Sequence, residues 1–314
     1  MPIIESRFRP PWYLRNCHVQ TILPALAAVG AGPVFRRERI ELPDGDFLDL
    51  DWIESGHKRL AILCSGLEGN SRDAGMLRLA RSFATGGWDV LSWNYRGCSG
   101  ALNRLARSYH SGATEDLAAV IAHAGKRPLA LVGCSIGGNL VLKYLGEAPP
   151  PATVLGAVSI SAPIDLASTA RALDQKPGNR IYLRRLIASL CEKVRSKAAA
   201  MPGHISLDGL RDLHGFAHFD ERYTAPTHGF LNAEDYWKKC SARQFLHAID
   251  VPTLLLSAKD DPFLTPESFP FPEAEGNPQL ALEVPEFGGH LGFLDRGGSW
   301  AGRRVPGFLA RFVP

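Results

Sequence analysis

Short apolar runs alternate along the chain with segments in which apolar residues recur every third or fourth position. The runs have the length of buried strands, and the segments between them have helical periodicity. This alternation is typical of an α/β protein with a mostly parallel sheet of about eight strands and helices on both faces. The strands are expected at Arg37–Leu42, Phe47–Ile53, Arg59–Ser65, Trp88–Asn94, Leu129–Cys134, Thr153–Ser161, Pro252–Ala258 and Leu280–Val284.

The first two expected strands are separated by the turn sequence Pro43-Asp44-Gly45-Asp46, so they predict an antiparallel hairpin at one edge of the sheet. Helices are expected at Met76–Gly86, Thr114–Gly125, Gly137–Gly146, Arg180–Lys197 and Trp300–Phe312. The first three lie between consecutive expected strands, as crossover connections of a parallel sheet do, and the last follows the final strand.

The alternation is interrupted between residues 163 and 248, where no strand-like run occurs. In the middle of this stretch, the apolar residues of Arg180–Lys197 follow the spacing of an amphipathic helix. We interpret residues 163–248 as a helical lid inserted between two core strands of a single domain that spans residues 1–314. Leu183, Leu186 and Leu190 on this helix either line an acyl tunnel or pack as plain core.

Composition and charge narrow the class of protein. The formal net charge is only +3, and no dense cluster of Lys and Arg suggests a nucleic-acid partner. The 6 cysteines form no C-x-x-C pair and favour free thiols in a reducing compartment. The N-terminal residues lack the order of a signal peptide, and the longest mild apolar run, Ile22–Val34, is too short to cross a bilayer. We therefore expect a soluble, cytoplasmic protein without a transmembrane segment, and the oligomeric state stays open.

The candidate chemistry begins with Gly133-Cys134-Ser135-Ile136-Gly137, which fits G-x-S-x-G between an expected strand and an expected helix. A sharp strand-to-helix turn with small neighbours lifts the serine hydroxyl clear of the sheet, toward the amides of the helix N-terminus. We therefore predict Ser135 as a nucleophile. Cys134 is a second candidate by residue type, but its place in the turn should direct the thiol into the core.

A serine hydroxyl needs an imidazole to take its proton and a carboxylate to orient that imidazole, in the chain order serine, acid, histidine for this turn. His290 lies in the glycine-flanked loop F-G-G-H-L-G-F, directly after the last expected strand. The loop after Pro252–Ala258 offers two adjacent carboxylates, Asp260 and Asp261. The spacing to Pro262 favours Asp261, while Asp260 is expected to face away and to hydrogen-bond locally.

The loop after Arg59–Ser65 carries Gly66 and Gly69, which allow a sharp bend of the backbone. We predict that the backbone N–H of Leu67 in this loop faces the backbone N–H of Ile136 in the serine turn. Two such donors would stabilise the oxyanion of a tetrahedral intermediate. The same glycines also suit an ordinary strand-to-helix loop, so this prediction depends on the serine motif.

Seven motifs in series make the chain similar to one branch of known hydrolases. They are R-N-C-H-V-Q-T-I-L-P at 15–24, N-Y-R-G-C-S-G at 94–100, R-S-Y-H-S-G-A-T-E-D-L at 107–117, G-C-S-I-G-G-N at 133–139, T-A-P at 224–226, D-D-P-F at 260–263 and G-G-H-L-G-F at 288–293. The series runs over nearly the whole chain and resembles the YheT-like hydrolases, which are related to the ABHD lipid and ester hydrolases.

The resemblance implies an α/β-hydrolase fold and a serine esterase that uses neither a metal nor another cofactor. It implies small, lipid-like carboxylic esters as substrates, often of medium chain length, and gives the triad roles to Ser135, Asp261 and His290. An acyltransferase that passes the acyl group to an alcohol, or a non-catalytic binding protein, could share this scaffold. Transient contact with a membrane surface is compatible with all three. Such proteins usually have His-Gly where this chain has Ser65-Gly66, so the support of the Leu67 N–H is expected to differ.

Two further groups are open to a functional and a structural interpretation. His214 and His218 have the spacing of a zinc pair, but the glutamate of H-E-x-x-H is missing and Gly215 weakens the helix, so we expect no metal site. A basic group in the loop 94–114 could meet an anionic substrate headgroup, although ordering of that loop through internal contacts is the expected role. Its members are Arg96, Arg104, Arg107 and His110.

Overall fold

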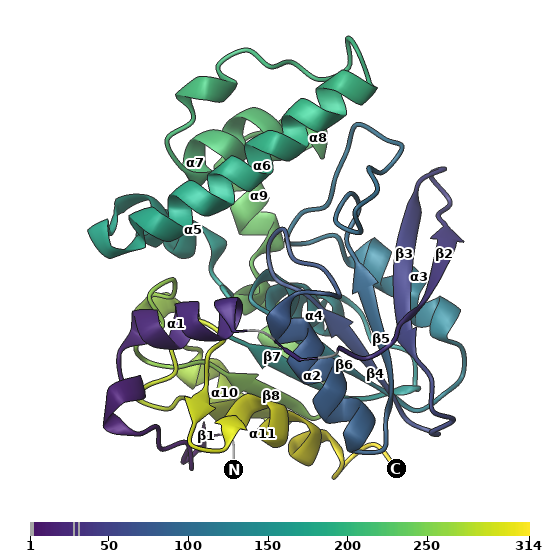
Figure 1. Ribbon diagram of the computed structural model, residues 1–314, viewed down its shortest axis with the longest axis vertical. Coiled ribbons are helices and arrows are strands. Elements are labelled where there is room, and N and C mark those ends of the chain that lie inside the picture. Colours follow the sequence, from purple (N-terminus) through teal and green to yellow (C-terminus); the bar gives the residue numbers. More distant parts are fainter. Residues whose placement is uncertain (1–2, 28, 31) are drawn as a thin grey trace.

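The computed structural model describes residues 3–27, 29–30 and 32–314 (Figure 1). In these ranges, nine strands form one sheet with the order β1-β9-β8-β7-β6-β4-β5-β3-β2. The strands are β1 (Ile3–Ile4), β2 (Arg36–Glu41), β3 (Phe47–Ile53), β4 (Leu60–Cys64), β5 (Asp89–Asn94), β6 (Leu129–Cys134), β7 (Val154–Ile160), β8 (Thr253–Leu256) and β9 (Leu280–Glu283). A separate antiparallel pair is formed by β10 (Leu294–Asp295) and β11 (Gly298–Ser299).

The sheet is parallel except at one edge. There β3 is antiparallel to β5, and β2 is antiparallel to β3 with Glu41 opposite Phe47 across the turn. The predicted hairpin and the eight predicted strands are therefore confirmed. The strand β1 is absent from the expected set because two residues carry no readable period, and it pairs in parallel with β9.

Helices surround the sheet. They are α1 (Cys17–Leu26), α2 (Ala74–Thr85), α3 (Thr114–Ala124), α4 (Ile136–Glu147), α5 (Leu166–Gln175), α6 (Arg180–Ala200), α7 (Phe216–Phe219), α8 (Ala225–Thr227), α9 (Ala233–Cys240), α10 (Phe271–Gly276) and α11 (Trp300–Leu309). Among the described residues, none of these helices combines the length and the apolar character that a bilayer crossing requires.

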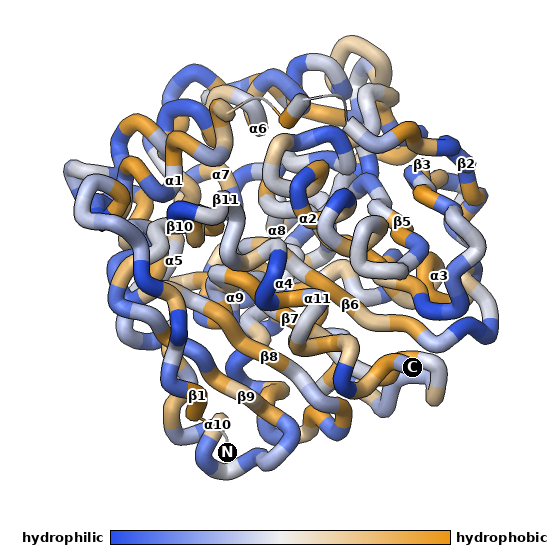
Figure 2. Tube along the Cα trace, turned by 60° about the horizontal axis from the view of Figure 1, so that its bottom comes forward, coloured by the Kyte–Doolittle hydropathy of each residue, from blue (hydrophilic) through white to orange (hydrophobic). Residues whose placement is uncertain are grey.

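Alternate residues of the central strands face opposite layers of helices. In β4, Leu60 and Ile62 belong to the hydrophobic cluster that includes residues of α3 and α4. Ala61 and Leu63 belong to the cluster that includes residues of α2 and α11. All positions of β4 are buried, which is why such a strand appears as an unbroken apolar run. Figure 2 shows that the neighbouring strands β6 and β8 are also mostly hydrophobic. A mostly parallel sheet with helices on both faces, as predicted, is confirmed.

Between β7 and β8 the described chain forms helices α5–α9 and no strand. We call this segment, residues 161–252, the cap. It has a hydrophobic cluster of its own, which includes Leu183, Ile187 and Trp237. Figure 1 shows the cap standing over one end of the sheet, with the long helix α6 running across it. The expected helix Arg180–Lys197 is α6, which continues to Ala200.

Candidate active site

Ser135 occupies the turn between β6 and α4 in a strained backbone conformation. Its φ of 54° and ψ of −122° lie in a region that residues with a side chain rarely adopt. The turn is held by hydrogen bonds of 2.8 Å from the Ser135 N–H to the Ile160 carbonyl and from the Gly138 N–H to the Ser135 carbonyl. Because β6 is buried along its length, the fold imposes this strain and holds the hydroxyl at the edge of the sheet.

The glycines of G-x-S-x-G are required by close backbone approach. A Cβ atom at Gly133 would lie 2.1 Å from the Gly137 carbonyl oxygen, and one at Gly137 would lie 2.4 Å from the Ser65 carbonyl oxygen. A Cβ atom at Gly138 would lie 2.6 Å from Ser159 Oγ. Any side chain at these positions would push the helix or the neighbouring loop away from Ser135.

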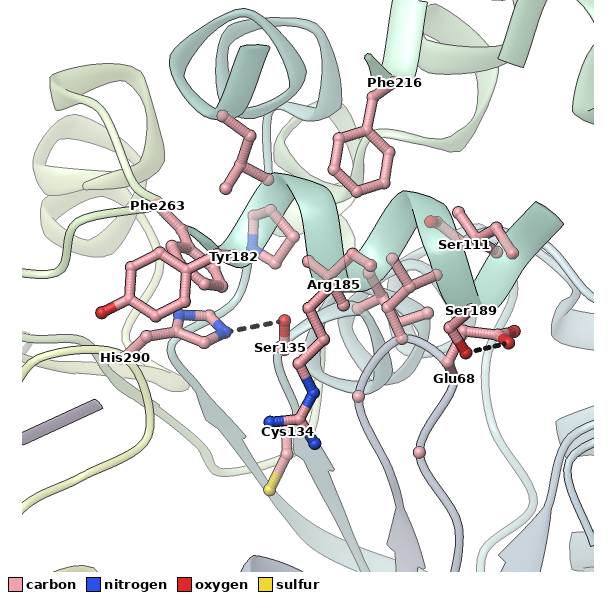
Figure 3. Close-up of a pocket in the computed structure, with 18 of the residues that line it drawn as sticks. Glu68, Ser111, Cys134, Ser135, Tyr182, Arg185, Ser189, Phe216, Phe263 and His290 are labelled. Carbon is pink, nitrogen blue, oxygen red and sulfur yellow. Dashed lines mark hydrogen bonds between the residues drawn. The ribbon is translucent and has the colours of Figure 1, made fainter. Parts of the chain in front are cut away.

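His290 and Asp261 meet Ser135 at the same edge of the sheet, and Figure 3 shows the contact between His290 and Ser135. The imidazole Nε2 lies 3.0 Å from Ser135 Oγ, and Nδ1 lies 2.9 Å from Asp261 Oδ2 and 3.1 Å from Oδ1. The side chain of Asp261 is 0% exposed and that of His290 is 8% exposed. The carboxylate favours the tautomer protonated at Nδ1, which leaves Nε2 free to accept the serine proton.

Asp260 hydrogen-bonds to the backbone of the His290 loop, whereas the imidazole itself is bound by Asp261. Its Oδ1 accepts the Gly289 N–H at 2.9 Å, so the bond runs to the His290 loop instead of staying within its own turn as expected. Its Oδ2 is buried and has no hydrogen-bond partner among the described residues. Burial, together with the negative charge of Asp261 nearby, raises the pKa of Asp260 to about 6.

Three side chains that the spacing argument did not single out hold the His290 loop. Thr21 Oγ1 accepts the His290 N–H at 2.9 Å, and Ser161 Oγ accepts the Leu291 N–H at 3.2 Å. The Phe263 ring stacks on the imidazole with the ring centroids 4.1 Å apart. Thr21 belongs to R-N-C-H-V-Q-T-I-L-P and Phe263 to D-D-P-F, so their motifs are the signal that could have found them.

Helix α1 packs directly beneath the same loop. Gln20 is fully buried, and its Nε2 donates to the carbonyls of Leu14 at 2.8 Å and Leu294 at 3.0 Å. Its Oε1 accepts the Leu294 N–H at 2.8 Å. A Cβ atom at Gly289 would lie 2.4 Å from the Cys17 carbonyl oxygen. The N-terminal helix is therefore part of the support of the candidate base.

The loop after β4 lies against the serine turn. A Cβ atom at Gly66 would be 3.4 Å from Ser135 Cβ, which places the next residue, Leu67, close to the serine turn. Neither the Leu67 N–H nor the Ile136 N–H donates a hydrogen bond within the described part of the chain. Two amides that are free beside a hydroxyl have the arrangement that an oxyanion site needs.

Two stacked tyrosines support this loop. Tyr95 donates to the Ser65 carbonyl at 2.9 Å, and its ring stacks on Tyr109 with the centroids 4.7 Å apart. Tyr109 Oη accepts the Glu68 N–H at 2.7 Å. The Ser65 hydroxyl is buried and has no partner among the described residues, so the side chain of Ser65 adds no hydrogen bond to the loop. Burial raises the pKa of both phenols, which therefore stay protonated.

A cavity of about 720 Å³ opens on Ser135 and His290. Its lining is mostly apolar and comes from α1, α2 and the cap. All three leucines of α6 pack in or against the cap cluster, and Leu186 and Leu190 also line the cavity, so both interpretations stay open for these two. Ser135 thus faces a space large enough for a small organic molecule.

The chain is similar to known proteins over most of its length. A family model described as "alpha/beta hydrolase fold" matches residues 62–297. The chain belongs to this family. The α/β hydrolase is 36% identical to YheT of Escherichia coli (strain K12), covering 98% of this chain and 94% of YheT. It is 26% identical to phospholipase ABHD3 of Mus musculus, covering 95% of this chain and 75% of that protein. The predicted resemblance to YheT-like and ABHD hydrolases is confirmed.

Solved structures show the same fold. The esterase Pf2001 of Pyrococcus furiosus superposes with a TM-score of 0.62 at 17% identity, covering 89% of this chain and 92% of that one. At this level of identity the likeness bears on the fold alone. It confirms the α/β-hydrolase fold that the motifs implied.

The basic residues of the loop 94–114 in this α/β hydrolase are engaged internally. The acidic partners are Asp44, Asp46 and Asp116 for Arg96, Glu41 for Arg104, and Asp44 and Glu115 for Arg107. None of these three arginines lines the cavity, while His110 does and packs against His228. The structural interpretation of the arginines is therefore confirmed.

The two remaining sequence candidates lie outside the triad. In the described ranges, no group of three or more His, Cys, Asp or Glu side chains has an arrangement that could hold a metal ion. Burial raises the pKa of the Cys134 thiol to about 12, so the thiol stays protonated at neutral pH. Figure 3 shows the Cys134 sulfur directed away from the Ser135 hydroxyl, as expected from its place in the turn.

We expect Thr21→Val to lower kcat for ester hydrolysis by about ten- to a hundredfold, because small errors in base placement are costly. The substitution keeps the shape of the side chain but removes the acceptor of the His290 N–H. Thr21→Ser is the matched control and should restore most of the rate, because the hydroxyl returns. Steady-state kinetics checks both variants, and a Thr21→Val enzyme with wild-type kcat would show that the loop is positioned without this contact.

Proposed function

We propose that this α/β hydrolase is a serine esterase that cleaves carboxylic acyl esters through an acyl-enzyme on Ser135. The observation that carries the proposal is the hydrogen-bonded chain from Ser135 Oγ through His290 to Asp261, which opens on a mostly apolar cavity. Such a cavity suits the acyl chain of a short- to medium-chain, lipid-like ester. The mouse relative is named a phospholipase, and that name supports the same class of reaction here.

In the proposed acylation step, Ser135 Oγ attacks the ester carbonyl carbon while its proton passes to His290 Nε2. The imidazolium that forms is stabilised by the Asp261 carboxylate, 2.9 Å from Nδ1. The carbonyl oxygen becomes an oxyanion, for which the N–H groups of Leu67 and Ile136 are the proposed donors. When the intermediate collapses, the alkoxide takes the proton from Nε2 and leaves as an alcohol.

Deacylation repeats the sequence with water as the nucleophile. His290 accepts a proton from water, water attacks the acyl carbon, and the carboxylic acid leaves as Ser135 regains its proton. Every bond and proton is accounted for by the enzyme, the ester and water, so the scheme uses neither a metal nor another cofactor. An alcohol in place of water would give a new ester, which is the acyltransferase alternative.

We further propose that residues 163–248, within the cap, act as a lid in a single domain of residues 1–314. Leu186 and Leu190 on α6 and Phe216 on α7 line the cavity, and Figure 3 shows Phe216 directed toward it. An acyl chain bound beside Ser135 would be enclosed between these side chains and the sheet. The cap would then set the length of chain that the enzyme accepts.

The proposal for the cellular location depends on the cysteine residues. The six cysteines are free thiols, which supports a reducing compartment and hence a cytoplasmic location. A cytoplasmic location, transient membrane contact and the lack of a nucleic-acid partner stay predictions from the sequence.

We expect the purified protein to hydrolyse p-nitrophenyl esters, with kcat/KM highest for short and medium acyl chains. We expect palmitate esters to react more slowly than butyrate or octanoate esters, because the cap side chains that line the cavity limit the length of chain that fits beside Ser135. Initial rates of nitrophenolate release across the series test this. A second arm adds ethanol and separates ethyl ester from free acid, and ethyl ester as the main product would make the enzyme an acyltransferase. A wild-type protein that is inert across the series would overturn the proposal and favour a binding protein.

A further inference from the structure

Glu68 stands at a strained position of the loop that carries Leu67. The Gly69 N–H donates to the Gly66 carbonyl at 3.0 Å and closes a turn whose two central residues are Leu67 and Glu68. Glu68 has a φ of 58°, which is the signature of the third position of a type II turn. Glycine or asparagine is usual there, because an L side chain strains the backbone. We therefore expect the contacts of the Glu68 side chain to offset the backbone strain at this position.

The Glu68 carboxylate connects the loop to helix α6 of the cap. Oε1 accepts from Lys193 Nζ at 2.6 Å and from Tyr109 Oη at 2.8 Å, and Oε2 accepts from Ser189 Oγ at 3.0 Å (Figure 3). The side chains of Glu68 and Lys193 are only 10% and 12% exposed, so their ion pair is poorly screened by solvent. Both carboxylate oxygens are thus occupied, and two of the three donors belong to the cap.

Helix α6 is itself held against the rest of the molecule near both of its ends. Near its C-terminal end, the buried Lys197 Nζ donates to the carbonyls of residues 105, 106 and 107 at 2.7–2.9 Å. Near its N-terminal end, Tyr182 Oη lies 2.9 Å from His18 Nδ1, and the Tyr182 ring packs edge-on against Phe263, the ring that stacks on His290. The helix that holds Glu68 therefore also contacts the support of the base.

We propose that Glu68 is a positioning residue that ties the Leu67 amide to helix α6 through Lys193 and Ser189, so that full turnover requires α6 to be seated on the loop. The inference rests on the proposed function, in which the Leu67 N–H receives the oxyanion. With Glu68 held, the turn keeps the Leu67 N–H beside Ser135 before substrate arrives. With α6 displaced, the carboxylate loses two partners, and the strained turn is free to relax. The oxyanion donor is thereby coupled to the position of the cap.

Glu68→Gly is the main test, because glycine suits the positive φ while the carboxylate is lost, together with its bonds to the cap and to Tyr109 Oη. We expect kcat for p-nitrophenyl butyrate to fall by about 10- to 100-fold with KM changed little. Inhibition by butylboronic acid should weaken by a similar factor, because its tetrahedral serine adduct uses the oxyanion donors. Lys193→Met should act in the same direction from the cap side. The matched control is Arg195→Met on the same helix. Arg195 forms an exposed ion pair with Glu192 and has no contact with Glu68 among those given above, so this variant should leave kcat and the inhibition constant of butylboronic acid unchanged.

The double variant Glu68→Gly, Lys193→Met decides between coupling and independent damage. Coupled residues give a double variant no slower than the slower single variant, whereas independent effects multiply. The inference would be overturned if Glu68→Gly kept wild-type kcat and boronic acid affinity, or if the effects of the two single variants multiplied in the double variant. The proposed function would still stand in either case, provided that the wild-type enzyme hydrolyses esters. A wild-type enzyme without esterase activity would overturn both. Equal losses in KM and in boronic acid affinity would indicate general damage to the cavity and would also overturn the positioning role.

Discussion

Ser135→Ala should lower kcat for p-nitrophenyl butyrate on the order of 10⁴- to 10⁶-fold, while the protein stays folded. In the proposed mechanism the hydroxyl forms the acyl-enzyme, and its only side-chain hydrogen bond within the described chain is to His290 Nε2. The substitution therefore removes the nucleophile without opening a cavity in the core. Steady-state kinetics together with a thermal melt measures both halves of this expectation.

Cys134→Ala is the matched control for that experiment. Cys134 is adjacent in the chain, and burial raises the pKa of its thiol to about 12. We expect Cys134→Ala to keep kcat within a few-fold of wild type and to lower the melting temperature, because it empties a buried position. If Cys134→Ala lost activity and Ser135→Ala kept it, the identity of the nucleophile would have to be changed.

Asp261→Asn should lower kcat by about 10⁴-fold, because an amide cannot hold the imidazole in the tautomer that leaves Nε2 unprotonated. The fold should survive, since the asparagine Oδ1 can still accept the Phe263 N–H that Asp261 accepts at 2.9 Å. Kinetics of Asp260→Asn, one position away, supplies the comparison. Equal losses for the two variants would show that the acid is not Asp261 alone.

The Asp260→Asn variant also carries a prediction about stability and pH. Burial raises the pKa of Asp260 to about 6, and its ordinary value is 3.8. A carboxyl whose pKa is raised by folding gives stability that is full below the ordinary pKa and is lost as the pH rises through the raised one. Asparagine does not ionise, so a variant with Asn at position 260 does not lose stability in this way. We expect Asp260→Asn to have a higher Tm than wild type at about pH 8 and a similar Tm at about pH 4, by thermal melts at both values.

Much of the fold could be predicted because it depends on patterns that are local in the sequence. The buried runs such as Leu129–Cys134 and the hairpin turn sequence are each complete within a few residues. The strand β1 could not be predicted, because its pairing with β9 joins residues at opposite ends of the chain. Its two residues show no pattern by themselves.

Some residues of the candidate site could likewise be predicted from local patterns, and others could not. Ser135, Asp261 and His290 could be proposed because each lies directly after a predicted strand in a turn of recognisable composition. Thr21 and Gln20 lie in one of the quoted motifs, but no local pattern gave them a role, because their contact with the His290 loop spans more than half of the chain. Glu68 escaped notice because its positive φ and its link to α6 exist only in the folded chain.

Backbone strain gathers around the candidate site. In the described ranges, the non-glycine residues with positive φ are Glu68, Ser135, Ser161, Leu291 and Phe293. Glu68 and Ser135 lie in the two segments proposed to hold the oxyanion, and Leu291 follows the candidate base. Such conformations persist only where the surrounding structure enforces them. Their gathering here supports a site whose geometry is set before substrate binds.

The central claim is that Ser135 is the nucleophile activated by His290. Labelling the native enzyme with a fluorophosphonate and mapping the modified peptide by mass spectrometry tests it most directly, since the adduct marks the attacking atom. We expect one adduct per chain on Ser135, formed much more slowly in Asp261→Asn. An adduct on Cys134 or on another serine, or labelling of Ser135 at the same rate in both proteins, would contradict it.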